Sequence, residues 1–263
     1  SILSKPFEET PSELREWATS LLDQTSPVEI PEGLRTQLGG GEVRLPSIRS
    51  SSDFAPASRL PTSDPRSRLV ASIARFDARG NSGASTCTAW LVSAFHVLTM
   101  GYCINQQTRE IDSARVVFGY MGTRANGAFT SLDVALPASE VGSSLDYAIL
   151  SLEGAASLNR NPLPISTRAP QVGDKLFLLQ HPRGRELLYS VQPCEVLALQ
   201  NTIVTHDCDT LPGSGGAPLI NADTLEVIGI HRASSATEPD QKYAVRIDAV
   251  MAQSNFLRGL LSS

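Results

Sequence analysis

The stretch Asp209–Pro218, with the sequence DTLPGSGGAP, contains three glycines and two prolines within ten residues. A Gly/Ser/Pro cluster of this kind usually marks a surface turn. Its glycines permit backbone conformations that other residues resist, and such conformations occur both in plain turns and in loops that form functional sites. The loop alone does not distinguish the two, so its interpretation depends on the segments around it.

Short segments with the composition of β-strands follow one another from about residue 69 to residue 246. Turn residues separate them at even spacing, which predicts an all-β Greek-key sandwich or barrels. The expected strands are Leu69–Phe76, Cys87–Val92, His96–Thr99, Arg115–Phe118, Asp133–Leu136, Tyr147–Leu152, Lys175–Gln180, Cys194–Leu199, Thr202–Thr205, Pro218–Ile220, Val227–His231 and Lys242–Arg246. Apolar residues at roughly helical spacing also predict a closing helix over Asp248–Leu261.

Residues 1–57 differ from the rest and are interpreted as a pro-segment-like extension with one helix. Thr10 followed by Pro11 is a typical helix start, since threonine caps the first turn and proline suits the first helical position. The apolar stripe that follows predicts a helix that ends near Gln24. A connector rich in Gly, Ser and Pro leads to the main domain, which we assign to residues 58–263.

The overall composition argues against several classes of function. The 263-residue chain carries a net charge of −5, has a sequence pI of about 5.4 and contains no long Lys/Arg run, so a nucleic-acid partner is not expected. No apolar stretch of the sequence is long enough to span a bilayer. The sequence contains no recognisable cofactor or metal-binding motif, so neither a cofactor nor a metal ion is expected.

The four cysteines predict two disulfides, Cys87–Cys103 and Cys194–Cys208. Each pair brackets two neighbouring strand-like segments, and no cysteine lies in a CxxC motif or with histidine at metal-ligand spacing. Disulfides are typical of oxidising compartments, so we expect a secreted or periplasmic protein. Four buried free thiols in a cytosolic protein are the alternative.

Two segments, Cys87–Val92 (CTAWLV) and His96–Ile104 (HVLTMGYCI), resemble the trypsin superfamily, and specifically the V8-like glutamyl endopeptidases. The second segment typically reads HVLTAGHCI in that family. Asp146–Leu150 (DYAIL) is similar to the family's catalytic aspartate segment, and Asp209–Pro218 is similar to its nucleophile loop. The resemblance covers about residues 60–263 in the family's chain order, and it implies a double six-stranded β-barrel of trypsin type.

The resemblance places the three catalytic positions at Tyr102, Asp146 and Gly215, where the family has histidine, aspartate and serine. The mechanism needs a hydroxyl to attack and an imidazole to take its proton. Gly215 has no side chain, and a tyrosine with a pKa near ~10 is a poor base at neutral pH. Loss of the reacting groups lowers turnover by about 10⁶-fold in a serine protease. The resemblance therefore implies a pseudoenzyme, a catalytically inactive serine protease homologue.

Ser214 is the alternative nucleophile, because it lies next to Gly215 in the same loop. In that alignment the turn glycine of the family would fall on Pro212, and the trailing proline would come one residue late. An active endopeptidase that uses Ser214 and a non-standard base thus stays open as a second hypothesis. An inactivated mutant or a proenzyme of a glutamyl endopeptidase is a further alternative, as is a structural domain with no ligand in the cleft.

The resemblance also implies that the binding groups are retained. Gly213 and Gly215 would supply the N–H groups of an oxyanion hole, and Thr210 and His231 correspond to the residues that contact the substrate carboxylate. A hydroxyl and an imidazole N–H can satisfy a buried carboxylate. The side chains of Arg232-Ala233-Ser234 replace family glycines beside the substrate strand and narrow the expected cleft. The expected partner is a peptide or a protein ligand, including an active protease relative.

Overall fold

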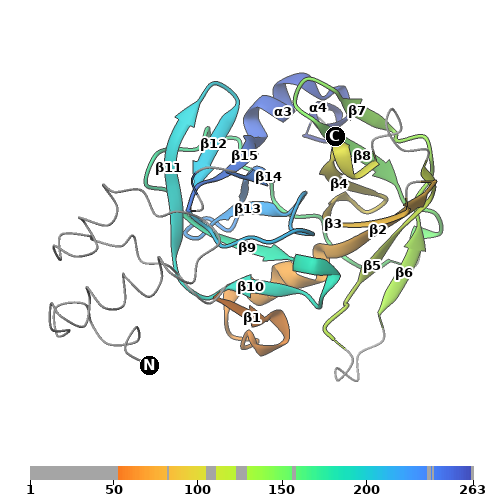
Figure 1. The fold of residues 1–263 in the computed structure, drawn as a ribbon, viewed down its shortest axis with the longest axis horizontal. Helices are drawn as coiled ribbons and strands as arrows, with labels where there is room; N and C mark the ends of the chain where they lie inside the picture. Colours follow the sequence, from red (N-terminus) through yellow and green to blue (C-terminus); the bar gives the residue numbers. More distant parts are fainter. Residues whose placement is uncertain are drawn as a thin grey trace, which may run out of the picture. The chain divides into compact units, whose positions relative to one another are not determined.

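The computed structural model describes residues 53–81, 83–104, 111–122, 129–155, 158–235, 238 and 240–261. All of them belong to one compact unit, Ser52–Ser263. The helix expected between Thr10 and Gln24 lies outside the described residues. All strands of the described residues belong to two sheets, and Figure 1 shows them as two groups; apart from β1, the strands of the second group follow those of the first in the sequence.

The first sheet curls into the N-terminal barrel. Its strand order is β6-β5-β2-β3-β4-β8-β7, with antiparallel pairs throughout. A bridge between Val134 and Leu152, supported by the Ala135 N–H bond to the Ser151 carbonyl at 3.0 Å, joins the end of β6 to the end of β8 and closes the ring. The strands are β2 Ile73–Gly80, β3 Gly83–Ser93, β4 His96–Met100, β5 Ile111–Phe118, β6 Thr130–Asp133, β7 Glu140–Gly142 and β8 Tyr147–Ser151.

The second sheet forms the C-terminal barrel. Its order is β1-β10-β9-β11-β12-β15-β14-β13, and the additional pairing of β9 with β13 closes six of these strands into a ring. The strands β10 and β1 extend the sheet beyond the ring. The strands are β1 Phe54–Pro56, β9 Lys175–Gln180, β10 Leu188–Ser190, β11 Cys194–Gln200, β12 Ile203–His206, β13 Pro218–Asn221, β14 Val227–Ser234 and β15 Lys242–Arg246.

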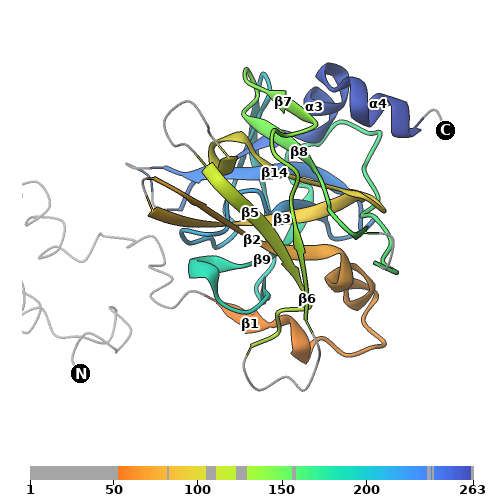
Figure 2. The same ribbon diagram turned by 90° about the vertical axis from the view of Figure 1, so that its right-hand side faces the viewer.

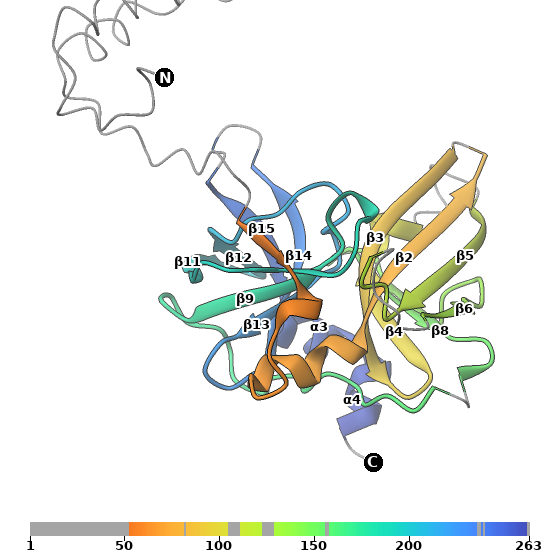
Figure 3. The same cartoon turned by 90° about the horizontal axis from the view of Figure 1, so that it is seen from below.

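Alternating apolar residues explain why the strands curl around two interiors. Trp90, Phe76 and Phe118 are fully buried in the N-terminal barrel, and Leu178 and Leu219 are fully buried in the C-terminal barrel. The strands β3, β9 and β13 that carry Trp90, Leu178 and Leu219 are buried over most of their length, and burial of their apolar residues favours closure. Figure 3 shows the two barrels side by side. The expected double barrel of trypsin type is confirmed.

Two expected strands differ from the structure. Residues 69–72 lie in a 3-10 helix, η4 Pro65–Ser72, because Asp64 caps its start through the Arg66 N–H at 2.9 Å and Pro65 occupies the first helical position. A strand was expected over Asp133–Leu136, but the strand in this region, β6, ends at Asp133. The apolar signal of the next residues comes from the turn that closes the barrel.

The C-terminal helix is two helices, α3 Ile247–Gln253 and α4 Asn255–Leu261, rather than the single one expected. Ser254 between them is buried and has an extended backbone, and its Oγ accepts the Leu257 N–H at 3.0 Å. That bond caps a new helix, so the first helix stops. The Phe256 N–H bonds the Glu140 carboxylate at 3.0 Å, which attaches α4 to the N-terminal barrel near β7 (Figure 2).

Candidate functional site

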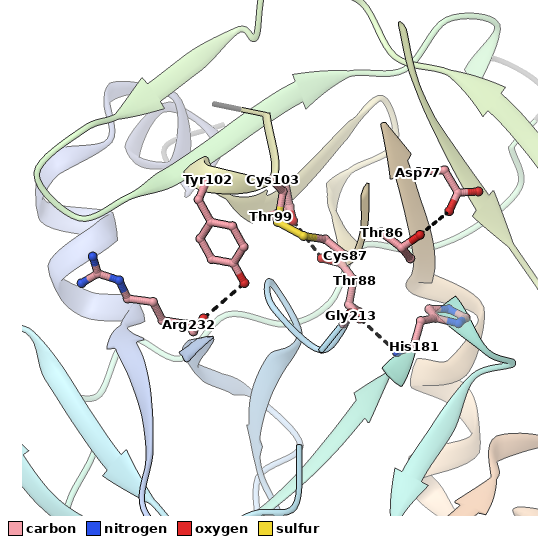
Figure 4. The surroundings of a disulfide bond; sticks show 10 residues. All are labelled: Asp77, Thr86, Cys87, Thr88, Thr99, Tyr102, Cys103, His181, Gly213 and Arg232. Atoms are coloured by element: carbon pink, nitrogen blue, oxygen red, sulfur yellow. Dashed lines mark hydrogen bonds between the residues drawn. A yellow bond between two sulfur atoms is a disulfide. The ribbon is translucent and has the colours of Figure 1, made fainter. Parts of the chain in front are cut away.

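Tyr102 lies on η5, the 3-10 helix Gly101–Ile104 that follows β4. The neighbours Gly101 and Cys103 are buried, and the Cys87–Cys103 disulfide fixes the helix to β3. The Tyr102 side chain is 42% exposed, and its hydroxyl donates to the Arg232 carbonyl at 3.2 Å (Figure 4). The side chain thus reaches from the N-terminal barrel to β14 of the C-terminal barrel.

Gly215 lies directly against the hydroxyl of Tyr102. A Cβ atom added to Gly215 would lie 1.7 Å from the Tyr102 Oη and 2.8 Å from its Cζ, both far below van der Waals contact. The tyrosine hydroxyl therefore occupies the volume in which a side chain at position 215 would begin. Tyr102 and Gly215 are therefore matched in space, because this tyrosine rotamer excludes any residue larger than glycine.

Asp146 lies in the turn before β8, with a φ of 57°. Its carbonyl accepts the Gly101 N–H at 2.6 Å, so the turn is bound to the start of η5. Its carboxylate lies 3.7 Å from the Arg232 Nε, a contact that replaces any bond to an imidazole. Burial raises the pKa of Asp146, and the Arg232 charge and the Tyr102 N–H partly oppose that rise. The structure thus brings all three expected catalytic positions together.

The hydroxyl of Tyr102 is a donor in this setting. Burial, followed by the charge of Asp146, raises the pKa of Tyr102 to about 12, although the charge of Arg232 acts in the opposite direction. The phenol is therefore protonated at neutral pH and cannot act as a general base there.

The loop around Ser214 directs its hydroxyl inward. Ser214 is 0% exposed, and its Oγ accepts the Leu211 N–H at 3.1 Å. Gly213 has a φ of +97°, and a Cβ there would lie 2.7 Å from the His181 carbonyl oxygen. Only glycine fits such a position without strain. The loop is thus a tight turn against the His181 segment, with the serine side chain on its buried side.

All four histidines bond to groups away from Tyr102. The His96 Nδ1 pairs with the Ser93 Oγ at 2.9 Å, and the His181 Nδ1 lies 2.9 Å from the Arg185 carbonyl. The His206 Nε2 lies 3.3 Å from the His231 Nδ1. Burial lowers the pKa of His96, His181, His206 and His231.

The expected binding residues lie on the C-terminal barrel. The Thr210 Oγ1 is 3.3 Å from the Ser234 Oγ, and the register shift in β14 puts the Ser234 side chain on the same face as His231. Thr210 is 9% exposed and His231 is 3% exposed, so both are almost completely enclosed. The structure brings Thr210 near Ser234, a residue that the sequence analysis considered only as a narrowing side chain.

Thr88 is a structural residue of the site that the sequence analysis did not single out. Its Oγ1 donates to the Gly213 carbonyl and accepts the His181 N–H, both at 3.0 Å, and its N–H donates to the Gly215 carbonyl at 2.8 Å (Figure 4). A threonine within a strand pattern gives no signal for such a role. The sequence shows that Arg232 stands where the family has a glycine. That difference alone does not predict the ion pair between Arg232 and Asp146.

The sequence matches the family model of the trypsin-like peptidase domain over residues 87–230. The chain belongs to this family. No curated protein matches the sequence significantly. Trypsin-like proteases are also found among the solved structures with a similar fold.

Three of these structures illustrate the likeness. The Rv3671c protease from M. tuberculosis in its active form is 15% identical, with a TM-score of 0.60 over 72% of this chain and 82% of that one. A serine endoprotease from Yersinia pestis is 20% identical, with a TM-score of 0.60 over 75% and 67%. A Glu endopeptidase is 17% identical, with a TM-score of 0.58 over 77% and 94%. At these identities the likeness concerns the fold.

Both expected disulfides are present, Cys87–Cys103 and Cys194–Cys208. Within the described ranges, no three or more His, Cys, Asp or Glu side chains are grouped so that they could hold a metal ion. None of the helices that the structure describes has the length and apolar character of a membrane span.

Proposed function

We propose that this trypsin-like domain is a catalytically inactive serine protease homologue that acts by binding a peptide or a partner protein. The observation that carries the proposal is the position of the Tyr102 hydroxyl, 1.7 Å from where the Cβ of residue 215 would be. A nucleophile at position 215 and the observed tyrosine cannot occupy the same space. The chain has neither the nucleophile nor the base at the two positions where the family mechanism needs them.

The enclosure of Ser214 supports the proposal against the active alternative. A nucleophilic hydroxyl must reach a substrate carbonyl and lie within hydrogen-bonding distance of a base. The Ser214 hydroxyl is fully buried and accepts a backbone N–H from Leu211. Among the described residues, the histidine ring nitrogens bond to groups other than the Ser214 hydroxyl.

Binding is the function that these residues still support. Thr210, Ser234 and His231 place two hydroxyls and an imidazole together on the C-terminal barrel, and such donors recognise a carboxylate. The ligand class we propose is a peptide or protein with an acidic residue, for which an active protease relative is one source. The two disulfides favour a secreted or periplasmic location.

The test of inactivity is hydrolysis of fluorogenic peptides cleaved after glutamate or aspartate. We expect no turnover by the natural chain, and turnover by the Tyr102→His/Gly215→Ser variant if the rest of the site is intact. A fluorophosphonate should label only that variant. Turnover by the natural chain that Ser214→Ala abolishes would overturn the proposal. If neither chain cleaves the peptides, the natural chain is still inactive, and the cleavage specificity of the family does not apply to this protein.

Binding is tested by isothermal titration calorimetry with N-acetylated tetrapeptide amides that end in glutamate. A second candidate function is a structural domain without a ligand at this site. One observation favours it: the Arg232 carbonyl already accepts a hydrogen bond from the Tyr102 hydroxyl. That candidate predicts that Thr210→Val/His231→Leu leaves every partner interaction unchanged. Our proposal predicts that this double variant loses peptide binding while its circular dichroism spectrum stays native.

A further inference from the structure

A cluster of five polar side chains lies on the C-terminal barrel, on one side of the sheet formed by β12, β14 and β15. From the outside inward, Ser234 is exposed, Thr210 is 9% exposed, Lys242 is 7% exposed, His231 is 3% exposed and His206 is 0% exposed. Lysine is rarely buried to this degree unless it is paired. We call this set the polar cluster.

The strand register explains how the polar cluster forms. Lys242 is the direct cross-strand partner of His206 on β12 and of Ser234 on β14, so the three side chains share one face. His231 and Ser234 are three residues apart and would point to opposite faces of a regular strand. The register of β14 shifts between His231 and Ala233, and this bulge returns both side chains to the face of Lys242.

The hydrogen bonds fix the direction in which the two histidines donate. The Cys208 N–H donates to the His206 Nδ1 at 3.2 Å, so His206 carries its proton on Nε2. That Nε2–H faces the His231 Nδ1 at 3.3 Å and donates to it. His231 therefore carries its own proton on Nε2 and presents a donor beyond the pair.

The two imidazoles stay neutral at physiological pH. Burial, and after it the positive charge of Lys242, lowers the pKa of His231 to about 3. Burial, then His231 and Lys242, lowers the pKa of His206 as well. The charge of Lys242 thus acts on both rings, and the strand register places its side chain on the same face of the sheet. Of the five side chains in the polar cluster, Lys242 is the one whose residue type is ordinarily cationic at neutral pH.

We infer that Lys242 supplies the positive charge that holds an acidic ligand side chain, whose oxygens the hydroxyls of Thr210 and Ser234 and the Nε2–H of His231 bind. Neutral donors can satisfy the hydrogen bonds of a carboxylate, but its charge is costly to enclose unless a cation is nearby. A lysine ammonium has three donors, so it can contact a ligand in addition to its neighbours in the protein. The inference rests on the proposed function and names the residue that would select an acidic ligand.

The test compares the natural chain with Lys242→Met and the charge-conserving control Lys242→Arg. Calorimetry measures N-acetylated tetrapeptide amides that end in glutamate or in its neutral counterpart, glutamine. We expect the natural chain to bind the glutamate peptide at least about tenfold more tightly. Lys242→Met should reduce this ratio to near one, because the glutamate peptide loses the attraction of the ammonium group, whereas the glutamine side chain carries no charge for that group to attract. Lys242→Arg should retain part of the preference.

A ratio near one in the natural chain, or a preference that survives in Lys242→Met, would overturn the inference. A second measurement separates it from the proposed function, because acetate presents a carboxylate without a peptide backbone. Titration of acetate, with chloride as the control, is followed by the ring nitrogen resonances of His231. If no peptide binds but acetate shifts these resonances only when Lys242 is present, the peptide proposal fails and the inference stands. If neither ligand has an effect, both fail.

Discussion

At the scale of single residues, Tyr102 and Gly215 form a pair whose members depend on each other. The tyrosine rotamer requires glycine opposite it, because even a methyl group at position 215 would overlap the hydroxyl. Gly215 is not among the glycines with positive φ, so its backbone alone would accept a side chain. The constraint on position 215 is therefore a contact with a residue that is distant in the sequence.

This pairing predicts a sign reversal in a double-mutant cycle. Gly215→Ala alone should lower the free energy of unfolding by about 1 kcal/mol, because the half-exposed Tyr102 side chain must move away. In a Tyr102→Ala background the same change should stabilise by about 0.5 kcal/mol, since alanine restricts the unfolded chain. Urea unfolding of the four chains measures the coupling energy.

Gly216→Ala is the control for that cycle. A Cβ at Gly216 would lie 2.1 Å from the Thr88 carbonyl oxygen, and its φ is +87°. Backbone cannot move away as a side chain can, so this variant should lose several kcal/mol in either background, on the order of 3 or more. Equal effects of Gly215→Ala with and without Tyr102 would contradict the proposed pairing.

At the scale of elements, the 3-10 helix η5 positions the Tyr102 side chain. It is only four residues long, and it is bound to β3 by the Cys87–Cys103 disulfide and to Asp146 through the Gly101 N–H. On the other barrel, the bulge in β14 sets the directions of the Arg232 and Ser234 side chains. Two irregular pieces of backbone thus position the groups that differ from the family pattern.

We predict that Cys87→Ala/Cys103→Ala lowers the free energy of unfolding by about 3 kcal/mol, as expected for a loop of this length. The variant should also free η5, so that N-acetylimidazole acetylates Tyr102 faster, as measured by mass spectrometry. The matched control is Cys194→Ala/Cys208→Ala, which opens a loop of similar length on the other barrel. Equal acetylation of Tyr102 in both variants would show that the disulfide does not position η5.

At the scale of the whole molecule, two closed barrels meet at the candidate site. Thr88 of the N-terminal barrel bonds the backbone of Gly213 and Gly215, and Tyr102 bonds the carbonyl of Arg232. Three buried histidines accompany this arrangement, His181 beside the loop and His206 with His231 in the C-terminal barrel. Their burial disfavours the charged form, which couples folding to pH.

This burial predicts that stability falls as the pH drops below 7. Burial lowers the pKa of His181 to about 4 and that of His231 to about 3, from 6.5, and it lowers that of His206 as well. Between pH 6.5 and about 4 the unfolded chain therefore binds protons that the folded chain does not, so acid favours unfolding. Each histidine contributes a slope of up to about 1.4 kcal/mol per pH unit.

Urea unfolding at pH 7, 6 and 5 measures this slope. His181→Asn keeps a donor toward the Arg185 carbonyl and should remove about a third of the slope, as one of three buried histidines. A free energy of unfolding that stays constant from pH 7 to pH 5 would show that the three imidazoles are not buried in the neutral form.

Local sequence was sufficient for much of the fold. The series of short strand-like segments predicted a sandwich or barrels, and the family resemblance specified the double barrel of trypsin type. Cysteine pairs that bracket neighbouring strands predicted both disulfides. Strand ends were less certain: Leu69–Ser72 has an alternating pattern, yet the Asp64 cap and Pro65 turn it into a 3-10 helix. The division of the last helix likewise depends on the burial of Ser254.

The sequence by itself determined that Tyr102 and Gly215 stand in segments that resemble the family's catalytic segments. Only the tertiary structure decided that the tyrosine hydroxyl occupies the space above the glycine, that Ser214 faces inward and that Lys242 joins the polar cluster. The reason is physical. These contacts join segments that meet only after each barrel closes and the two barrels pack together, and no local pattern records them.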